Sequence, residues 1–168
     1  IGTPVAAQNI IISVGGMAVQ MIVNGFGMSF IAGFTATNKL YGILEIAAIS
    51  YGYAVTTYVG QNYGALERGR IKSGIRAALV LSVVTSALIA VIMIVFGRTI
   101  TMLFISSEDP ELAAAAGNTA YLYLCIMSVL LPVLYLLYVY RSALQGMGNT
   151  MTAMVSGIIE FVLRVGVA

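Results

Sequence analysis

The chain has 168 residues, of which 60% are hydrophobic and 8% charged, with a formal net charge of +2 and a mean hydropathy of +1.00. Soluble domains carry about a quarter charged residues, so this composition excludes an ordinary soluble protein. The sequence has no His and one cysteine, Cys125, which excludes a disulfide framework and a His/Cys metal site. We therefore predict an all-α fold, a polytopic bundle of membrane helices.

Five membrane spans are predicted, because a helix of about 20 mostly apolar residues crosses a bilayer. The fourth span contains Pro132, whose missing N–H and bulky ring predict a kink. The spans cover, in chain order, residues 4–26, 32–63, 70–105, 110–140 and 150–168.

One basic cluster, in residues 60–76, sets the expected orientation. It lies between the second and third spans and contains Arg68, Arg70, Lys72 and Arg76. Such cations resist translocation and are attracted to the anionic inner leaflet. We expect this loop in the cytoplasm, with the turn at 141–149 on the same side and the acidic turn at 106–111 outside. A multi-pass protein of the cytoplasmic (plasma) membrane is predicted, in contact with membrane lipid and without a nucleic-acid partner.

The first span has a polar side. At 100° per residue, Asn9, Ser13, Gly16, Gln20 and Asn24 fall within one sector of the helix. Two interpretations stay open. The amides join neighbouring helices by hydrogen bonds, with help from small residues that allow close approach, or they line a cavity.

The second span carries polar side chains on two sectors. Asn38, Tyr41 and Glu45 share one sector, and Lys39 lies on the other. An ionisable residue at membrane depth costs a few kcal/mol and is by default a functional-site hypothesis. The alternatives are that Lys39 extends to the outer interface and that Glu45 is a buried structural acceptor.

The fifth span places Ser156, Glu160 and Arg164 at successive intervals of four residues, on one helix face. Glu160 and Arg164 form a static pair in one interpretation. In the other they line a cavity, where the carboxylate takes up a proton or attracts a cationic substrate and the arginine tunes its proton affinity.

Catalytic constellations are absent from the sequence. There is no His to activate a Ser, no acidic pair placed for acid–base chemistry and no phosphate-binding glycine loop. We therefore expect no enzyme activity and no organic cofactor.

Three motifs resemble the multidrug and toxic compound extrusion (MATE) family. They are Gly-Thr-Pro-Val-Ala-Ala at 2–7, Val-Gly-Gln-Asn-Tyr-Gly-Ala at 59–65 with Glu67 and Arg68 after it, and the stretch at 141–150. The resemblance covers essentially the whole chain. The order of spans resembles the second, C-terminal six-helix lobe, from its first helix into its fifth. The chain also opens without Met, so we expect a piece of a longer protein whose N-terminal lobe is the missing partner.

The resemblance implies an antiporter that exports organic cations, drugs or other small amphipathic compounds in exchange for Na⁺ or H⁺. Binding sites of such two-repeat transporters form near the membrane midplane. Several family members use acidic residues at places that align with Ile12 and Leu134. Coupling is therefore expected to rest on Glu45, on Glu160 or on the missing lobe.

Two other functions stay open. A flippase for lipid-linked oligosaccharides has a similar architecture, but it should carry several cavity cations for a pyrophosphate, and only Lys39 and Arg164 are in place. A structural or assembly membrane protein needs no ionisable group inside the bilayer.

Overall fold

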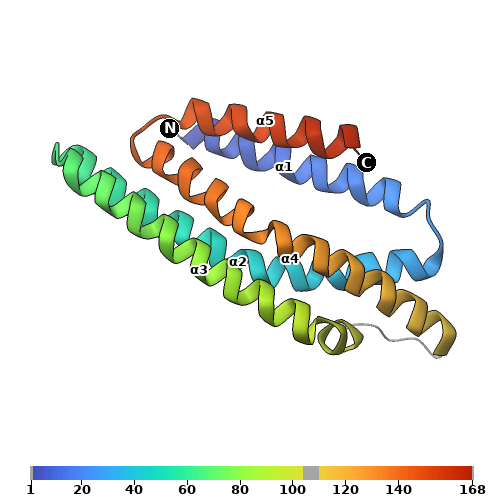
Figure 1. Cartoon of the computed structure of the whole chain (residues 1–168). Helices are drawn as coiled ribbons and strands as arrows, with labels where there is room; N and C mark the ends of the chain where they lie inside the picture. The colour runs from blue at the N-terminus through green and yellow to red at the C-terminus, as the bar shows by residue number, and fades with distance from the viewer. Residues whose placement is uncertain (1, 104–109, 168) are drawn as a thin grey trace.

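A computed structural model describes residues 2–103 and 110–167, which form five α-helices and, within those ranges, no strand (Figure 1). The predicted all-α helix bundle is confirmed. Most of the acidic turn expected at 106–111 lies outside the described residues. The helices are α1 (Gly2–Val23), α2 (Met28–Gly64), α3 (Arg68–Met102), α4 (Pro110–Gly146) and α5 (Thr150–Val167).

Three described stretches are long and apolar enough to cross a membrane: Gly2–Val23, Arg68–Met102 and Ala113–Gly146. The apolar part of α5 is shorter. α2 has 37 residues, as many as α4, but it is not among these stretches, and Lys39, Glu45 and many hydroxyl groups lie along it. The pattern is that of a multi-pass membrane bundle in which α2 has polar surroundings over part of its circumference.

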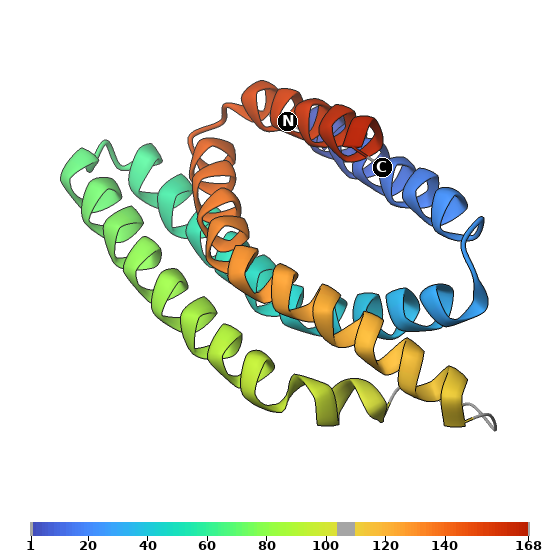
Figure 2. The ribbon, with the colours of Figure 1, turned by 45° about the vertical axis from the view of Figure 1, so that its right-hand side comes forward.

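The helices pack in two groups. α2, α3 and α4 pack against one another, most extensively α2 with α4, whereas α1 packs mainly on α5 and scarcely touches α2. Figure 2 shows the α1–α5 pair on one side and the α2–α3–α4 group on the other, joined by short connections. The fold therefore places two helix pairs, α1–α5 and α2–α4, opposite each other.

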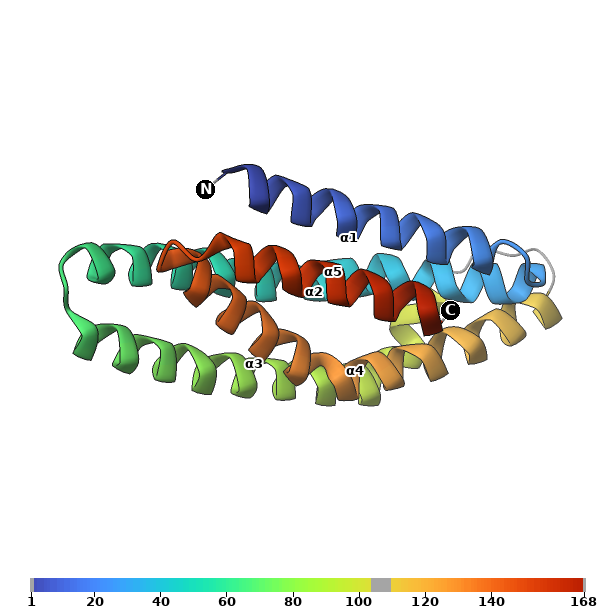
Figure 3. The ribbon, with the colours of Figure 1, turned by 90° about the horizontal axis from the view of Figure 1, so that it is seen from above.

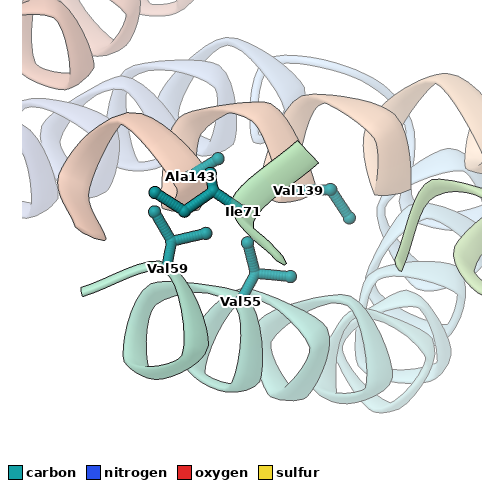
Figure 4. Packing of buried hydrophobic residues seen from close by; sticks show 5 residues of the cluster. All are labelled: Val55, Val59, Ile71, Val139 and Ala143. Carbon is teal, nitrogen blue, oxygen red and sulfur yellow. The ribbon is translucent and has the colours of Figure 1, made fainter. Parts of the chain in front are cut away.

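Apolar side chains hold the three-helix group together near the 65–67 turn. Val55 and Val59 of α2 meet Ile71 of α3 and Val139 and Ala143 of α4, and all five are buried (Figure 4). Between membrane helices such a contact is stabilised mainly by van der Waals packing, because lipid tails are as apolar as these side chains. This cluster fixes the ends of the three helices relative to one another.

Glycines allow α2 and α4 to approach closely. A Cβ on Gly146 would lie 2.7 Å from the Thr56 carbonyl oxygen, and one on Gly33 would lie 2.7 Å from that of Ala116. Small residues at helix crossings of this kind are typical of membrane bundles, because backbones then contact directly. The two contacts fix α4 along most of the length of α2.

α4 extends farther than the sequence predicted. It continues to Gly146, and only residues 147–149, with Gly148 at φ 84°, form the turn to α5. Residues 141–146 contain no proline and several good helix formers, so nothing local ends the helix at 140. Arg141, expected in a cytoplasmic turn, is instead a helical residue with 7% of its surface exposed. The helix also bends along its course, as expected from Pro132 within it (Figure 3).

Candidate functional site

Two neighbouring cavities lie between α1 and the α2–α4 pair. One, of about 350 Å³, is lined by Gln8, Asn9 and Ser13 of α1 and by polar residues of α2 and α4. The other, of about 450 Å³, is lined by Gly16 and Val19 of α1 and by residues of α2 and α4. Ile12 lines both, so the cavities are neighbours along one face of α1.

The opposite face of α1 is apolar and exposed. Ile10, Val14, Met17 and Met21 have between 48% and 76% of their surface exposed. The helix thus presents amides and hydroxyls to the cavities and long apolar side chains away from them. This division matches a helix with lipid on one side and water on the other.

Glu45 is the acidic group of the larger cavity. Its Oε1 atom accepts a 2.6 Å hydrogen bond from the Tyr138 hydroxyl of α4. Tyr41 and Asn38 lie one and two turns away along α2 and line the same cavity. The Tyr138 side chain itself lines the smaller cavity, so the Glu45–Tyr138 hydrogen bond connects the two spaces.

Aromatic rings form a wall of the larger cavity. The rings of Phe34 and Tyr123 stack with their centroids 5.3 Å apart, and Tyr41 lines the same space. Aromatic faces attract cations, with a worth of about 0.5 to 2 kcal/mol according to desolvation. A carboxylate and several aromatic rings around one cavity suit an organic cation.

Arg141 forms the centre of a polar network beside the smaller cavity. Its Nε donates to Ser156 Oγ at 2.9 Å, and its Nη2 forms an ion pair with Glu160 Oε2 at 3.0 Å. The two charged residues are 7% and 24% exposed, so the pair is mostly shielded from water. Paired in this way, the arginine brings no net charge to the cavity wall.

Gln8 completes the network from α1. Its carboxamide lies 3.2 Å from Gln145 Nε2 and 3.1 Å from Arg141 Nη1. When the amide oxygen is turned toward the guanidinium, it accepts a hydrogen bond from Arg141 Nη1. The side chain is 97% buried because it packs on Gly157, where a Cβ would lie 2.8 Å from Gln8 Cγ. Residues of α1, α4 and α5 therefore meet at Arg141.

The structure brings some of the predicted site residues together and leaves others apart. Asn9 lines the smaller cavity, and Asn38, Tyr41 and Glu45 line the larger one. Gln20 and Asn24 line neither cavity; the Gln20 amide donates to Asn24 at 3.0 Å. Lys39 is exposed and lines neither cavity, and the side chain of Arg164 lies outside the described part of the chain.

Sequence reasoning missed Gln8, Tyr138 and Arg141. A signal for Arg141 was present, since the residues after it have high helix propensity and an Arg one turn inside a membrane helix needs an acidic partner. For Gln8 the signal was weaker. It falls outside the sector defined by the other amides, and only the packing of α5 on α1 determines that it faces inward.

Comparisons with known proteins identify the family. The MatE family model matches residues 4–168. The chain is 30% identical over 165 residues to the probable multidrug resistance protein YpnP of Bacillus subtilis. The aligned region covers 98% of the chain and 36% of that protein. It is 28% identical over 109 residues to the probable multidrug resistance protein YoeA of Bacillus subtilis, covering 65% of the chain and 24% of that protein.

The chain thus spans about a third or less of the length of these two relatives. No solved structure matches it. Because the family model covers nearly the entire sequence, the chain belongs to the MatE family of membrane transporters, as its motifs predicted.

Proposed function

We propose that the chain is the C-terminal lobe of an antiporter that exports organic cations or other small amphipathic compounds in exchange for Na⁺ or H⁺. One observation carries the proposal: the Glu45 carboxylate lies in a cavity of about 450 Å³ whose other walls include the rings of Phe34, Tyr41 and Tyr123. The resistance-protein names of the two relatives support the same class of cargo.

The chemistry of this cavity supports binding of a cation. A carboxylate at membrane depth is costly and is retained where it has a cationic partner or takes up a proton. Small-molecule sites in proteins combine mainly apolar and aromatic walls with a few polar groups that set orientation. Glu45 and Asn38 supply the polar groups here.

Exchange follows if the substrate and the coupling ion compete for one carboxylate. A proton or Na⁺ on Glu45 removes the charge that attracts the organic cation, so loading one ligand releases the other. The Tyr138 hydroxyl, 2.6 Å from Oε1, holds the carboxylate in the cavity through both states. Alternating access of the two lobes would then expose the site to each side of the plasma membrane in turn.

Glu45 is a better candidate for coupling than the other positions in this chain. Ile12 lines both cavities but has no charge, and Leu134 packs on the apolar cluster around Tyr135. Glu160 has Arg141 as a partner at 3.0 Å. A carboxylate already neutralised by a guanidinium attracts a second cation less strongly.

A flippase receives less support. Arg141 is a cavity cation that sequence reasoning overlooked, but Glu160 neutralises it. Among the described side chains that line the two cavities, no second Lys or Arg is present to meet a pyrophosphate.

The test uses full-length protein in sealed vesicles, a fluorescent cationic dye, and Na⁺ and proton gradients imposed separately. Wild type should move the dye under at least one gradient, and Glu45→Gln should abolish that movement. Glu67→Gln is the matched control, because Glu67 is exposed at the start of α3 and outside both cavities. Dye movement equal to that of empty vesicles would remove the antiporter proposal. Normal efflux in both Glu45→Gln and Glu160→Gln would show that neither carboxylate couples transport and would remove the role proposed for Glu45. A structural or assembly protein would show no gradient-driven dye movement in wild type or in either variant.

A further inference from the structure

A groove of about 490 Å³ lies between α2 and α3, apart from the cavities described above. Its walls are almost entirely apolar, with Tyr51, Ala54 and Tyr58 on α2 and Gly74, Ala77 and Leu81 on α3. No residue of this groove lines either of the α1-facing cavities. The groove is therefore separate from the candidate transport site.

A basic pocket continues the groove at one end. This pocket, of about 220 Å³, is lined by Gly69, Lys72, Ser73 and Arg76, which share one face of the first turns of α3. Ser73 lines both the pocket and the groove. An apolar channel thus leads directly to two cations and a hydroxyl.

Two side-chain contacts connect α2 and α3 beside the groove. The Tyr58 hydroxyl donates to the Arg70 carbonyl oxygen at 3.3 Å, and the Tyr51 hydroxyl lies 2.8 Å from Thr85 Oγ1. On α3 the groove is lined from Ser73 to Leu81, which is about 12 Å of helix, while the hydrocarbon of one leaflet is about 15 Å thick. The groove therefore accommodates most of the part of an acyl chain that lies in one leaflet.

Tyr58 gives the groove its shape. Its ring lies on Gly74, where a Cβ would collide with it. α2 and α3 are in this way held apart by an aromatic ring, and small residues such as Ala54 and Ala77 line the space beside it. Tyr58 is 40% exposed and Leu81 is 56% exposed, so the groove opens on the outer surface of the three-helix group.

The charge at the basic end selects the ligand. Arg68 and Arg70 add two cations to Lys72 and Arg76, and the only acid in residues 60–76 is Glu67. The positive end of the α3 dipole adds to the attraction for an anion. A zwitterionic headgroup gains little here, whereas a headgroup with a net negative charge gains the full attraction.

We propose that this composite site binds an anionic phospholipid of the inner leaflet. The lipid phosphate would be held by Lys72, Arg76 and the Ser73 hydroxyl, and one acyl chain would fill the groove between α2 and α3. Both halves of the ligand are required, since the pocket suits a phosphate and the groove suits a hydrocarbon chain. Bound lipid would connect the first turns of α3 to α2 beside the 65–67 turn.

Binding is measured on full-length protein in detergent, as the rise in thermal unfolding midpoint when phosphatidylglycerol or phosphatidylcholine is titrated in. Phosphatidylglycerol should stabilise wild type and phosphatidylcholine should not. Removing one cation should weaken the affinity for phosphatidylglycerol about fivefold, and Lys72→Gln with Arg76→Gln about 25-fold. Arg98→Gln is the control for Arg76→Gln, because both arginines are exposed on α3 but Arg98 lies at the other end of the helix.

A second pair of variants tests the groove. Ala77→Phe should block the acyl chain and lower phosphatidylglycerol affinity, whereas Ala87→Phe, at an exposed alanine outside the groove, should not. Glycerol phosphate at equal concentration should not stabilise the protein. The lipid proposal is overturned by equal losses in Arg76→Gln and Arg98→Gln, by full affinity in Ala77→Phe, or by stabilisation from glycerol phosphate alone.

Discussion

Arg141 of α4 and Glu160 of α5 form an ion pair of 3.0 Å that joins the two helix groups of the fold. α4 and α5 make few other contacts, and α1 scarcely touches α2. The guanidinium also binds Ser156 and faces Gln8 of α1. This network is therefore the main polar connection across the cavity, and its loss should loosen the α1–α5 pair.

A double-mutant cycle measures this connection. Arg141→Met and Glu160→Gln should each lower the free energy of unfolding by about 3 kcal/mol, because each leaves a shielded charge or polar partner without its ion pair. The double variant should be less destabilised than the sum, with a coupling energy of about 1 to 3 kcal/mol. Arg98→Met removes an exposed arginine whose hydrogen bond to Asn118 is long, at 3.3 Å, so stability should change by about 0.5 kcal/mol or less. Additive effects at Arg141 and Glu160 would contradict the pairing.

Tyr138→Phe tests the hydrogen bond to Glu45. Losing this 2.6 Å contact should lower stability by about 1 to 2 kcal/mol and reduce dye efflux, since the carboxylate is no longer held toward the cavity. Tyr140→Phe is the control, because Tyr140 is 56% exposed and lines neither cavity. Thermal unfolding and vesicle efflux of both variants make the comparison. Equal behaviour of the two would show that the hydroxyl of Tyr138 does not position Glu45.

Gly146→Ala tests the close crossing of α2 and α4. The added methyl group would lie 2.7 Å from the Thr56 carbonyl oxygen, so the helices must separate, at a cost of about 1 to 3 kcal/mol. Gly42→Ala has no atom within 4 Å of the new methyl group and lies in the same helix pair. It should be neutral or stabilising by up to about 1 kcal/mol, since alanine favours the helix. A loss of stability in Gly42→Ala but not in Gly146→Ala would contradict a close crossing of α2 and α4 at Gly146.

The sequence predicted where the helices lie along the chain better than which side chains they bring together. Apolar run length and the charge clusters identified five helices, because spanning length and polar turns are local properties. The helical period also predicted that Asn38, Tyr41 and Glu45 share one face of α2, and all three line the larger cavity. The Arg141–Glu160 pair was not foreseen, because it depends on α4 extending past residue 140 and on α5 packing beside it. Spacing alone offered Arg164 as a partner of Glu160, and that prediction stays open because the side chain of Arg164 lies outside the described part of the chain.

The most direct test of a watery cavity facing α1 is thiol accessibility in a Cys125→Ala background. Ser13→Cys places a thiol in the smaller cavity, and Ile10→Cys places one on the apolar face, 63% exposed in this chain and directed toward lipid in our account. In permeabilised vesicles, a charged methanethiosulfonate reagent should modify Ser13→Cys rapidly and Ile10→Cys slowly, because the reactive thiolate does not form in hydrocarbon. Cationic dye should protect Ser13→Cys. Slow modification of Ser13→Cys, or equal rates at both positions, would contradict the existence of that cavity.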